Sequence, residues 1–137
     1  MSGGGEGAPL AATTPARSNR HPGVLVLLGL AVAVQLVVLY SPDGGGPPPF
    51  AQADKVVHLL VFLVPVALAV VAGFRRRVVV AVFGAQAVLS EVVQGLFLSH
   101  RSGDPLDALA DLVGLALGVL VGTMLLRRRS DPHRERG

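Results

Sequence analysis

The chain has no cysteine, and only 15% of its 137 residues are charged. The absence of cysteine excludes both a disulfide framework and a thiolate metal site. The low charged fraction comes with 51% hydrophobic residues and a mean hydropathy of +0.60, which is too apolar for an ordinary soluble domain of this length. The composition therefore indicates a membrane protein.

Lysine is also scarce, because eleven of the twelve basic residues are arginine. The arginines gather beside apolar runs and do not line one face of an amphipathic helix. Basic residues in such positions are typical of the flanks of membrane spans. The net charge of +3 therefore does not indicate a nucleic-acid partner, and the lipid bilayer is the expected environment.

Four long apolar runs follow a segment, residues 1–21, that has too little apolar surface to fold and is expected to be a disordered cytoplasmic tail. Each run has the length of a membrane span, about 17 to 25 residues, and must pair its backbone groups internally. The sequence thus predicts an all-α, polytopic four-helix transmembrane bundle over 22–126 and a basic cytoplasmic tail over 127–137. The helices are expected at about 23–40, 56–74, 78–98 and 106–126.

The arginines also predict the orientation. Ten of the twelve basic residues precede the first run, join the second to the third, or follow the fourth, while the other two connections hold only Lys55 and Arg101. Positive charge stays on the cytoplasmic side, so both ends of the bundle are expected inside and residues 98–104 outside. A cleaved signal peptide is disfavoured because the first run ends without a small-x-small cleavage site.

Ionisable residues collect where the predicted second helix begins, the third ends and the fourth begins. Within each helix they follow i, i+3, i+4 or i+7 spacing, so each set occupies one helical face. Charges that face lipid cost about 2.5 to 3.5 kcal/mol each at a helix centre, so we expect the three faces to turn toward one another. The predicted result is an outward-open polar pocket with Glu91 and Asp111 at its floor, built from Asp54, Lys55, His58, Glu91, Gln94, Arg101, Asp104, Asp107 and Asp111.

Acids outnumber bases in this predicted pocket. Clustered carboxylates repel, so either some are protonated at neutral pH or a cation joins them. A divalent cation with oxygen and imidazole ligands fits, and the candidate ligands are His58, Glu91, Asp107 and Asp111. Asp104, directly before Pro105, is expected to cap the fourth helix.

Small residues recur every four positions in the fourth run, at Ala110, Gly114, Gly118 and Gly122. This small-xxx-small pattern predicts close helix packing. The partner is either a helix of the same chain or a second copy, so the oligomeric state stays open.

Three segments, "DKVVH" at 54–58, "EVVQ" at 91–94 and "RSGDPLDALADLVG" at 101–114, together resemble the VanZ-like family of bacterial membrane proteins. The resemblance covers roughly residues 54–122 and implies that the pocket residues named above are the family's motif positions. It also implies a multi-pass protein of the bacterial plasma membrane with a link to resistance against glycopeptides of the teicoplanin type. Asp111 stands where family members often carry Asn, which adds a charge to the floor.

Three functions fit this sequence. The first is binding of an envelope lipid or cell-wall precursor head group, because Lys55, His100 and Arg101 at the mouth suit a phosphate or carboxylate. The second is metal-assisted hydrolysis or transfer on such a lipid. The third is a non-enzymatic scaffold subunit whose acids fix helix register. An ion carrier is disfavoured because the charges stop at mid-membrane.

Overall fold

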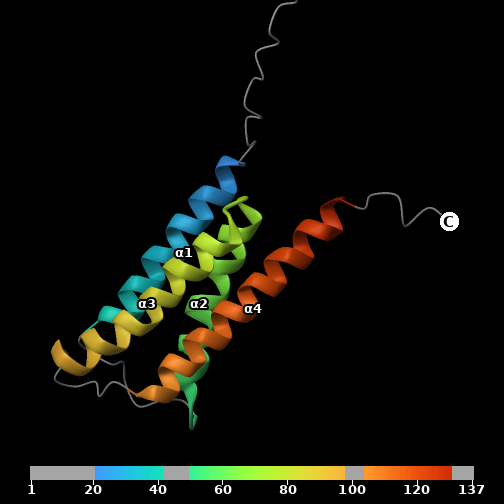
Figure 1. Ribbon diagram of the computed structural model, residues 1–137. Helices are drawn as coiled ribbons and strands as arrows, with labels where there is room; N and C mark the ends of the chain where they lie inside the picture. Colours follow the sequence, from blue (N-terminus) through green and yellow to red (C-terminus); the bar gives the residue numbers. More distant parts are fainter. Residues whose placement is uncertain (1–20, 42–49, 98–103, 131–137) are drawn as a thin grey trace, which may run out of the picture.

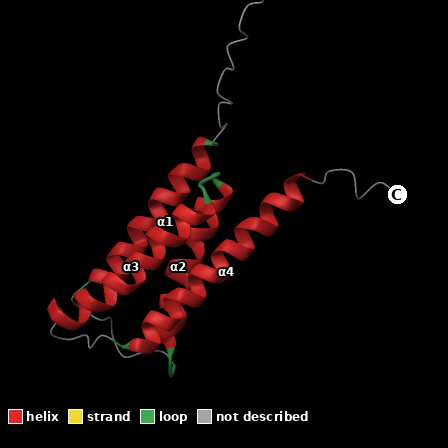
Figure 2. Ribbon diagram, viewed as in Figure 1, coloured by secondary structure: helices red, strands yellow, loops and turns green. Residues whose placement is uncertain are grey.

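The computed structural model describes residues 21–41, 50–97 and 104–130, and every regular element in these ranges is a helix (Figures 1 and 2). The elements are α1 (Pro22–Tyr40), α2 (Ala53–Val71), α3 (Arg76–Phe97) and α4 (Pro105–Ser130). All four are long and apolar enough to cross a bilayer. The chain is therefore an all-α multi-pass membrane protein, as predicted.

Three helix ends differ from the sequence prediction by three or more residues. The fourth helix was expected to stop at residue 126, but α4 continues through Arg127–Arg129 to Ser130. Arginine is a good helix former, and a cation in the last turn interacts favourably with the carbonyl end of the helix dipole. The second helix was expected to begin at 56, but α2 begins at Ala53 and so includes Asp54 and Lys55.

A glycine ends α2 three residues before the predicted boundary. Gly73 has φ 83°, in the left-handed region that favours glycine. Its N–H donates to the Val70 carbonyl (3.0 Å), and the Phe74 N–H donates to the Ala69 carbonyl (3.1 Å). This pair of bonds is a Schellman motif, which satisfies the last carbonyls of the helix and turns the chain into α3.

The helices run alternately up and down, so the start of α2, the end of α3 and the start of α4 lie at one end of the bundle (Figure 1). The buried core between them includes Phe62 and Val66 of α2, Phe83 of α3 and Leu115 of α4. The rings of Phe62 and Phe83 meet edge to face, with centroids 6.4 Å apart. The core thus fixes α2 at the centre, and the rest of the apolar surface is left for lipid.

The most extensive helix pair is α2 with α4, and glycine makes it close. A Cβ placed on Gly118 would lie 2.7 Å from the Leu63 carbonyl oxygen and 2.7 Å from Val66 Cβ. Gly122 meets Ala67 and Val70 in the same way, and Gly114 meets Leu59. The small-residue stripe therefore packs against a helix of the same chain.

Gly118→Ala is expected to lower the free energy of unfolding by about 1–3 kcal/mol, because the added methyl group meets backbone and a branched side chain. The matched control is Gly29→Ala on α1, where a Cβ would meet nothing within 4 Å. Thermal unfolding of both variants in the same detergent is the measurement. Equal stability of the two variants would contradict this account of the α2–α4 contact.

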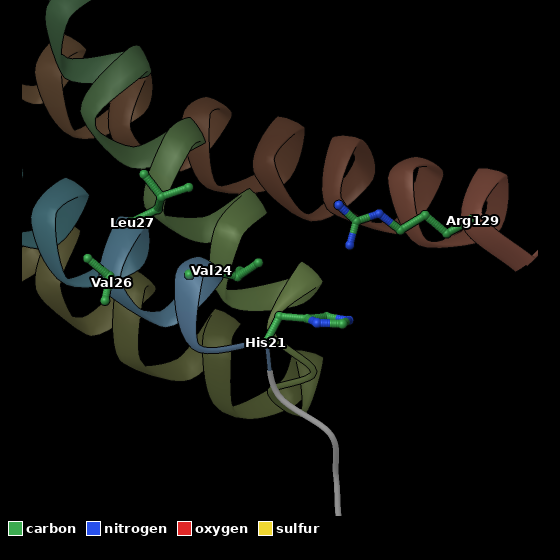
Figure 3. Close-up of a pocket in the computed structure, with 6 residues that line it drawn as sticks. His21, Val24, Val26, Leu27 and Arg129 are labelled. Atoms are coloured by element: carbon green, nitrogen blue, oxygen red, sulfur yellow. The ribbon is translucent and has the colours of Figure 1, made fainter.

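The two ends of the bundle carry opposite charge. Arg75–Arg77 lie at the α2–α3 turn and Arg127–Arg129 in the last turn of α4, both at the end opposite the acids. At this basic end an open groove of about 690 Å³ lies between α1 and α4 (Figure 3). His21 and Arg129 point into it, and the apolar side chains of Val24 and Leu27 are among its other lining residues. Its lining is mainly apolar, as is expected of a surface in contact with lipid. The groove lies at the end of the bundle opposite the ionisable cluster.

Candidate functional site

The ionisable residues of three helices meet at one end of the bundle, here called the polar end. Its members come from the first turns of α2, the last turns of α3, the residue before α4 and the first two turns of α4. The described ones are Asp54, Lys55, His58, Glu91, Asp104, Asp107 and Asp111. The convergence expected from the sequence is therefore present among the described residues.

Lys55 is the centre of the outer part of this cluster. Its Nζ lies 2.9 Å from Asp104 Oδ2, 2.9 Å from Asp107 Oδ1 and 3.1 Å from Asp54 Oδ2. An ammonium has three N–H donors, so these three carboxylates use all of them. Lys55 thus joins α2 to the start of α4 and has no donor left for a phosphate, contrary to the role expected for it at the mouth of a pocket.

Asp104 has two tasks, one for each carboxylate oxygen. Oδ1 accepts from the Leu106 N–H at 2.9 Å, which makes Asp104 the predicted cap of α4. Oδ2 accepts from Lys55. The Lys55 ammonium, and then the Leu106 amide, hold the pKa of this carboxyl below its ordinary value of 3.8.

A second pair lies one turn deeper. His58 Nδ1 is 3.0 Å from Asp111 Oδ1, and the two side chains are 5% and 0% exposed. A carboxylate facing Nδ1 favours the tautomer with its proton on Nδ1, which leaves the Nε2 lone pair free. Asp111 therefore orients His58, and its other oxygen, Oδ2, is buried with no partner among the described residues.

Glu91 is the least satisfied member of the cluster. Both of its carboxylate oxygens are inaccessible to solvent, and neither has a hydrogen-bond partner among the described residues. A buried acceptor without a donor is costly, so this carboxylate is placed for something other than packing.

Exposure falls steadily from the bundle end inward. The side chain of Asp54 is 56% exposed, that of Asp104 36%, Lys55 20% and Asp107 12%, whereas His58 and Asp111 are nearly or fully buried. Glu91 lies six residues before the end of α3 and Asp111 six residues after the start of α4, so both are roughly 9 Å deep. This gradient agrees with the expected floor at Asp111, whereas Glu91 is half-buried and only its carboxylate oxygens are inaccessible.

Gln94 does not belong to this cluster, although the sequence grouped it there. Its Nε2 donates to the Leu39 carbonyl at 3.0 Å and thereby ties α3 to the end of α1. One turn deeper on α1, Gln35 is fully buried, and neither of its amide atoms has a partner among the described residues. Sequence reasoning did not single out Gln35 as a buried polar residue.

Two predicted site residues, His100 and Arg101, lie outside the described residues. Of the four candidate metal ligands, His58, Glu91 and Asp107 each offer an atom within 4.8 Å of the others. Asp111 is not in this group, and its Oδ1 faces His58 Nδ1. The described site thus contains a three-helix donor set backed by one orienting carboxylate.

No protein-family model, curated protein or solved structure matches this chain. The fold and the site by themselves define an all-α multi-pass membrane protein with a buried ionisable cluster at one end.

Proposed function

We propose that the polar end faces the outer leaflet of a bacterial plasma membrane and binds the head group of an envelope lipid or cell-wall precursor, as expected for a VanZ-like protein. The separation of charge supports this orientation, since the arginines lie at the opposite end and positive charge stays cytoplasmic. The observation that carries the binding role is the inward gradient of exposure, which ends at carboxylate oxygens that lack donors.

The unpaired acceptors define what such a ligand must bring to the floor. Glu91 and the free oxygen of Asp111 need hydroxyl, amide or ammonium donors, or a cation. Sugar and peptide parts of a precursor head group carry such donors. A bare phosphate is repelled at this depth, because the described acids outnumber Lys55 and His58.

Orientation is tested by cysteine labelling, because the chain has no cysteine and each introduced one is unique. Ser99→Cys is expected to react in intact cells with a membrane-impermeant maleimide, and Ser130→Cys only after lysis. The reverse pattern would place the polar end in the cytoplasm and end the outer-leaflet proposal.

Binding is tested by native mass spectrometry of the purified chain with two probes, phosphatidylglycerol and a precursor lipid bearing a sugar–peptide head group. The precursor is expected to bind at lower concentration, and Glu91→Ala to weaken it at least tenfold. Equal retention of both lipids by wild type and variant would show annular lipid only. Expression of the wild type, and not of Glu91→Ala, is expected to raise teicoplanin tolerance.

Metal-assisted hydrolysis or transfer on the same lipid is the second candidate. It is favoured by the close approach of His58, Glu91 and Asp107. A phosphate-release assay on the precursor lipid, with and without chelator, separates turnover from binding.

A further inference from the structure

We propose that His58, Glu91 and Asp107 bind a divalent transition-metal ion, with one ligand supplied by each of α2, α3 and α4. One donor atom of each residue lies within 4.8 Å of the other two. Ligand atoms on a tetrahedral Zn²⁺ with bonds of about 2.0–2.2 Å are roughly 3.4 Å apart. The three side chains therefore need only small rotations to close around an ion.

Asp111 supplies the support that such a site needs. Histidines that bind metals through one ring nitrogen usually donate the other N–H to a carboxylate, which fixes the tautomer and the ring orientation. The 3.0 Å contact of His58 Nδ1 with the fully buried Asp111 is this arrangement, with Nε2 left as the ligand atom. Asp111 is thus a positioning residue for the ion.

Glu91 gives a separate indication of a ligand. Its two oxygens are buried and have no hydrogen-bond partner among the described residues. A carboxylate in that state is expected to be either protonated or bound to a cation. An ion held with His58 and Asp107 gives Glu91 the partner that the described side chains do not.

The charges of the surrounding residues favour a dication. Asp54, Asp104 and Asp107 share the Lys55 ammonium, so that, among the residues the structure describes, His58 is the one basic group left for Glu91 and Asp111. Lys55 takes Oδ1 of Asp107, so Oδ2 remains for an ion. A divalent ion neutralises the excess at a depth where uncompensated charge is costly.

The donor set also selects the kind of ion. Imidazole suits zinc and other first-row ions, whereas magnesium and calcium prefer oxygen ligands alone. Three protein ligands leave a coordination position open, as in catalytic zinc sites. That position is where a hydroxyl, water or phosphate oxygen of a head group could bind, which would reverse the repulsion of phosphate at the floor.

The test uses the chelator-treated full chain in detergent and Zn²⁺ alone as the probe. Zinc is expected to raise the melting temperature of the wild type and to remain at one ion per chain after dialysis. Glu91→Gln removes a ligand without changing shape, so it is expected to weaken zinc at least about 100-fold, while Asp111→Asn weakens it about 10–100-fold. Asp54→Asn is the matched control, since it removes one exposed acid of the same cluster and no ligand.

The outcomes separate cleanly. Absence of zinc-dependent stabilisation in the wild type, or its retention in Glu91→Gln, overturns the site. Equal loss in Asp54→Asn shows general attraction to acidic charge and overturns it too. Glu91→Asp keeps the charge but withdraws it by one methylene, so it tests the geometry if Glu91→Gln fails to fold. Zinc binding needs no head group, so the cation site and the head-group proposal can each fail alone.

Discussion

Lys55→Met is expected to lower the melting temperature several times more than removal of a cation at the basic end. The reason is that three carboxylates, those of Asp54, Asp104 and Asp107, converge on this single ammonium within 3.1 Å. Without it they repel one another at the start of α2 and α4 and pull the helix ends apart. Thermal unfolding in one detergent at pH 7 and low salt is the measurement.

The pH dependence of this loss has a defined sign. In the wild type, Lys55 holds the pKa of Asp104 below its ordinary value of 3.8, so the stability from this pair is complete above that value and is lost as the pH falls through the lowered pKa. In Lys55→Met the same carboxylates are unpaired, and their protonation relieves the repulsion. Acidification from pH 7 toward 4 is therefore expected to raise the melting temperature of the variant. The difference in melting temperature between the variant and the wild type should become smaller.

Arg129→Met is the control for this experiment, because it removes a cation that makes no ion pair among the described residues. A second variant, Lys55→Met with Asp107→Asn, is expected to recover part of the loss by removing one of the repelling acids. If Lys55→Met is as stable as Arg129→Met at pH 7, the ammonium does not hold the polar end together.

The sequence predicted this convergence because two simple rules sufficed. Apolar runs of membrane length define the helices, and short connections make successive helices antiparallel. Helical spacing then places His58 on one face with Asp54, and Asp107 on one face with Asp111. Lipid is a poor solvent for all of them, so the faces had to meet.

The pairing inside the cluster could not be predicted in the same way. Which acid Lys55 or His58 contacts depends on helix rotation and on depth to within a residue, and the periodicity of a single sequence does not fix either. The glycine stripe of α4 provides the missing constraint, since Gly118 against Leu63 and Val66 sets the register of α4 on α2. That register brings Asp111 to His58 and removes it from the set of direct metal candidates.

Gln94 is a residue that the sequence assigned to the cluster and that the structure places elsewhere. Its spacing from Glu91 put it on the same face as the acids, but a side chain with both donors and acceptors can be satisfied by backbone at a helix end. The carbonyl of Leu39 on α1 accepts the hydrogen bond from Gln94 Nε2. The sequence offered no register for α1, whose connection to α2 is the long segment rich in glycine and proline, and so this bond could not be foreseen.

Asp111→Ala is expected to be the most destabilising single change in α4, by about 3–5 kcal/mol, because it leaves His58 buried without its partner. Replacing both residues by leucine is expected to cost less than Asp111→Ala, since an apolar pair of similar volume needs no compensation. Equilibrium unfolding of the two single variants and the double variant gives the coupling free energy. Thr123→Ala is the control in the same helix, because the hydrogen bond of its hydroxyl among the described residues is to the Val119 carbonyl one turn away.

Asp111→Asn separates the hydrogen bond from the charge. The amide oxygen still accepts from His58 Nδ1, so the tautomer and the fold are expected to survive with a loss of about 1 kcal/mol. The charge that strengthens Nε2 as a ligand is gone, so zinc affinity is expected to fall by a larger free energy than the stability of the fold. If Asp111→Asn loses neither stability nor zinc affinity, Asp111 only fills space. A variant that loses as much stability as Asp111→Ala would show that the charge itself holds α2 to α4, and the hydrogen bond alone would then be insufficient.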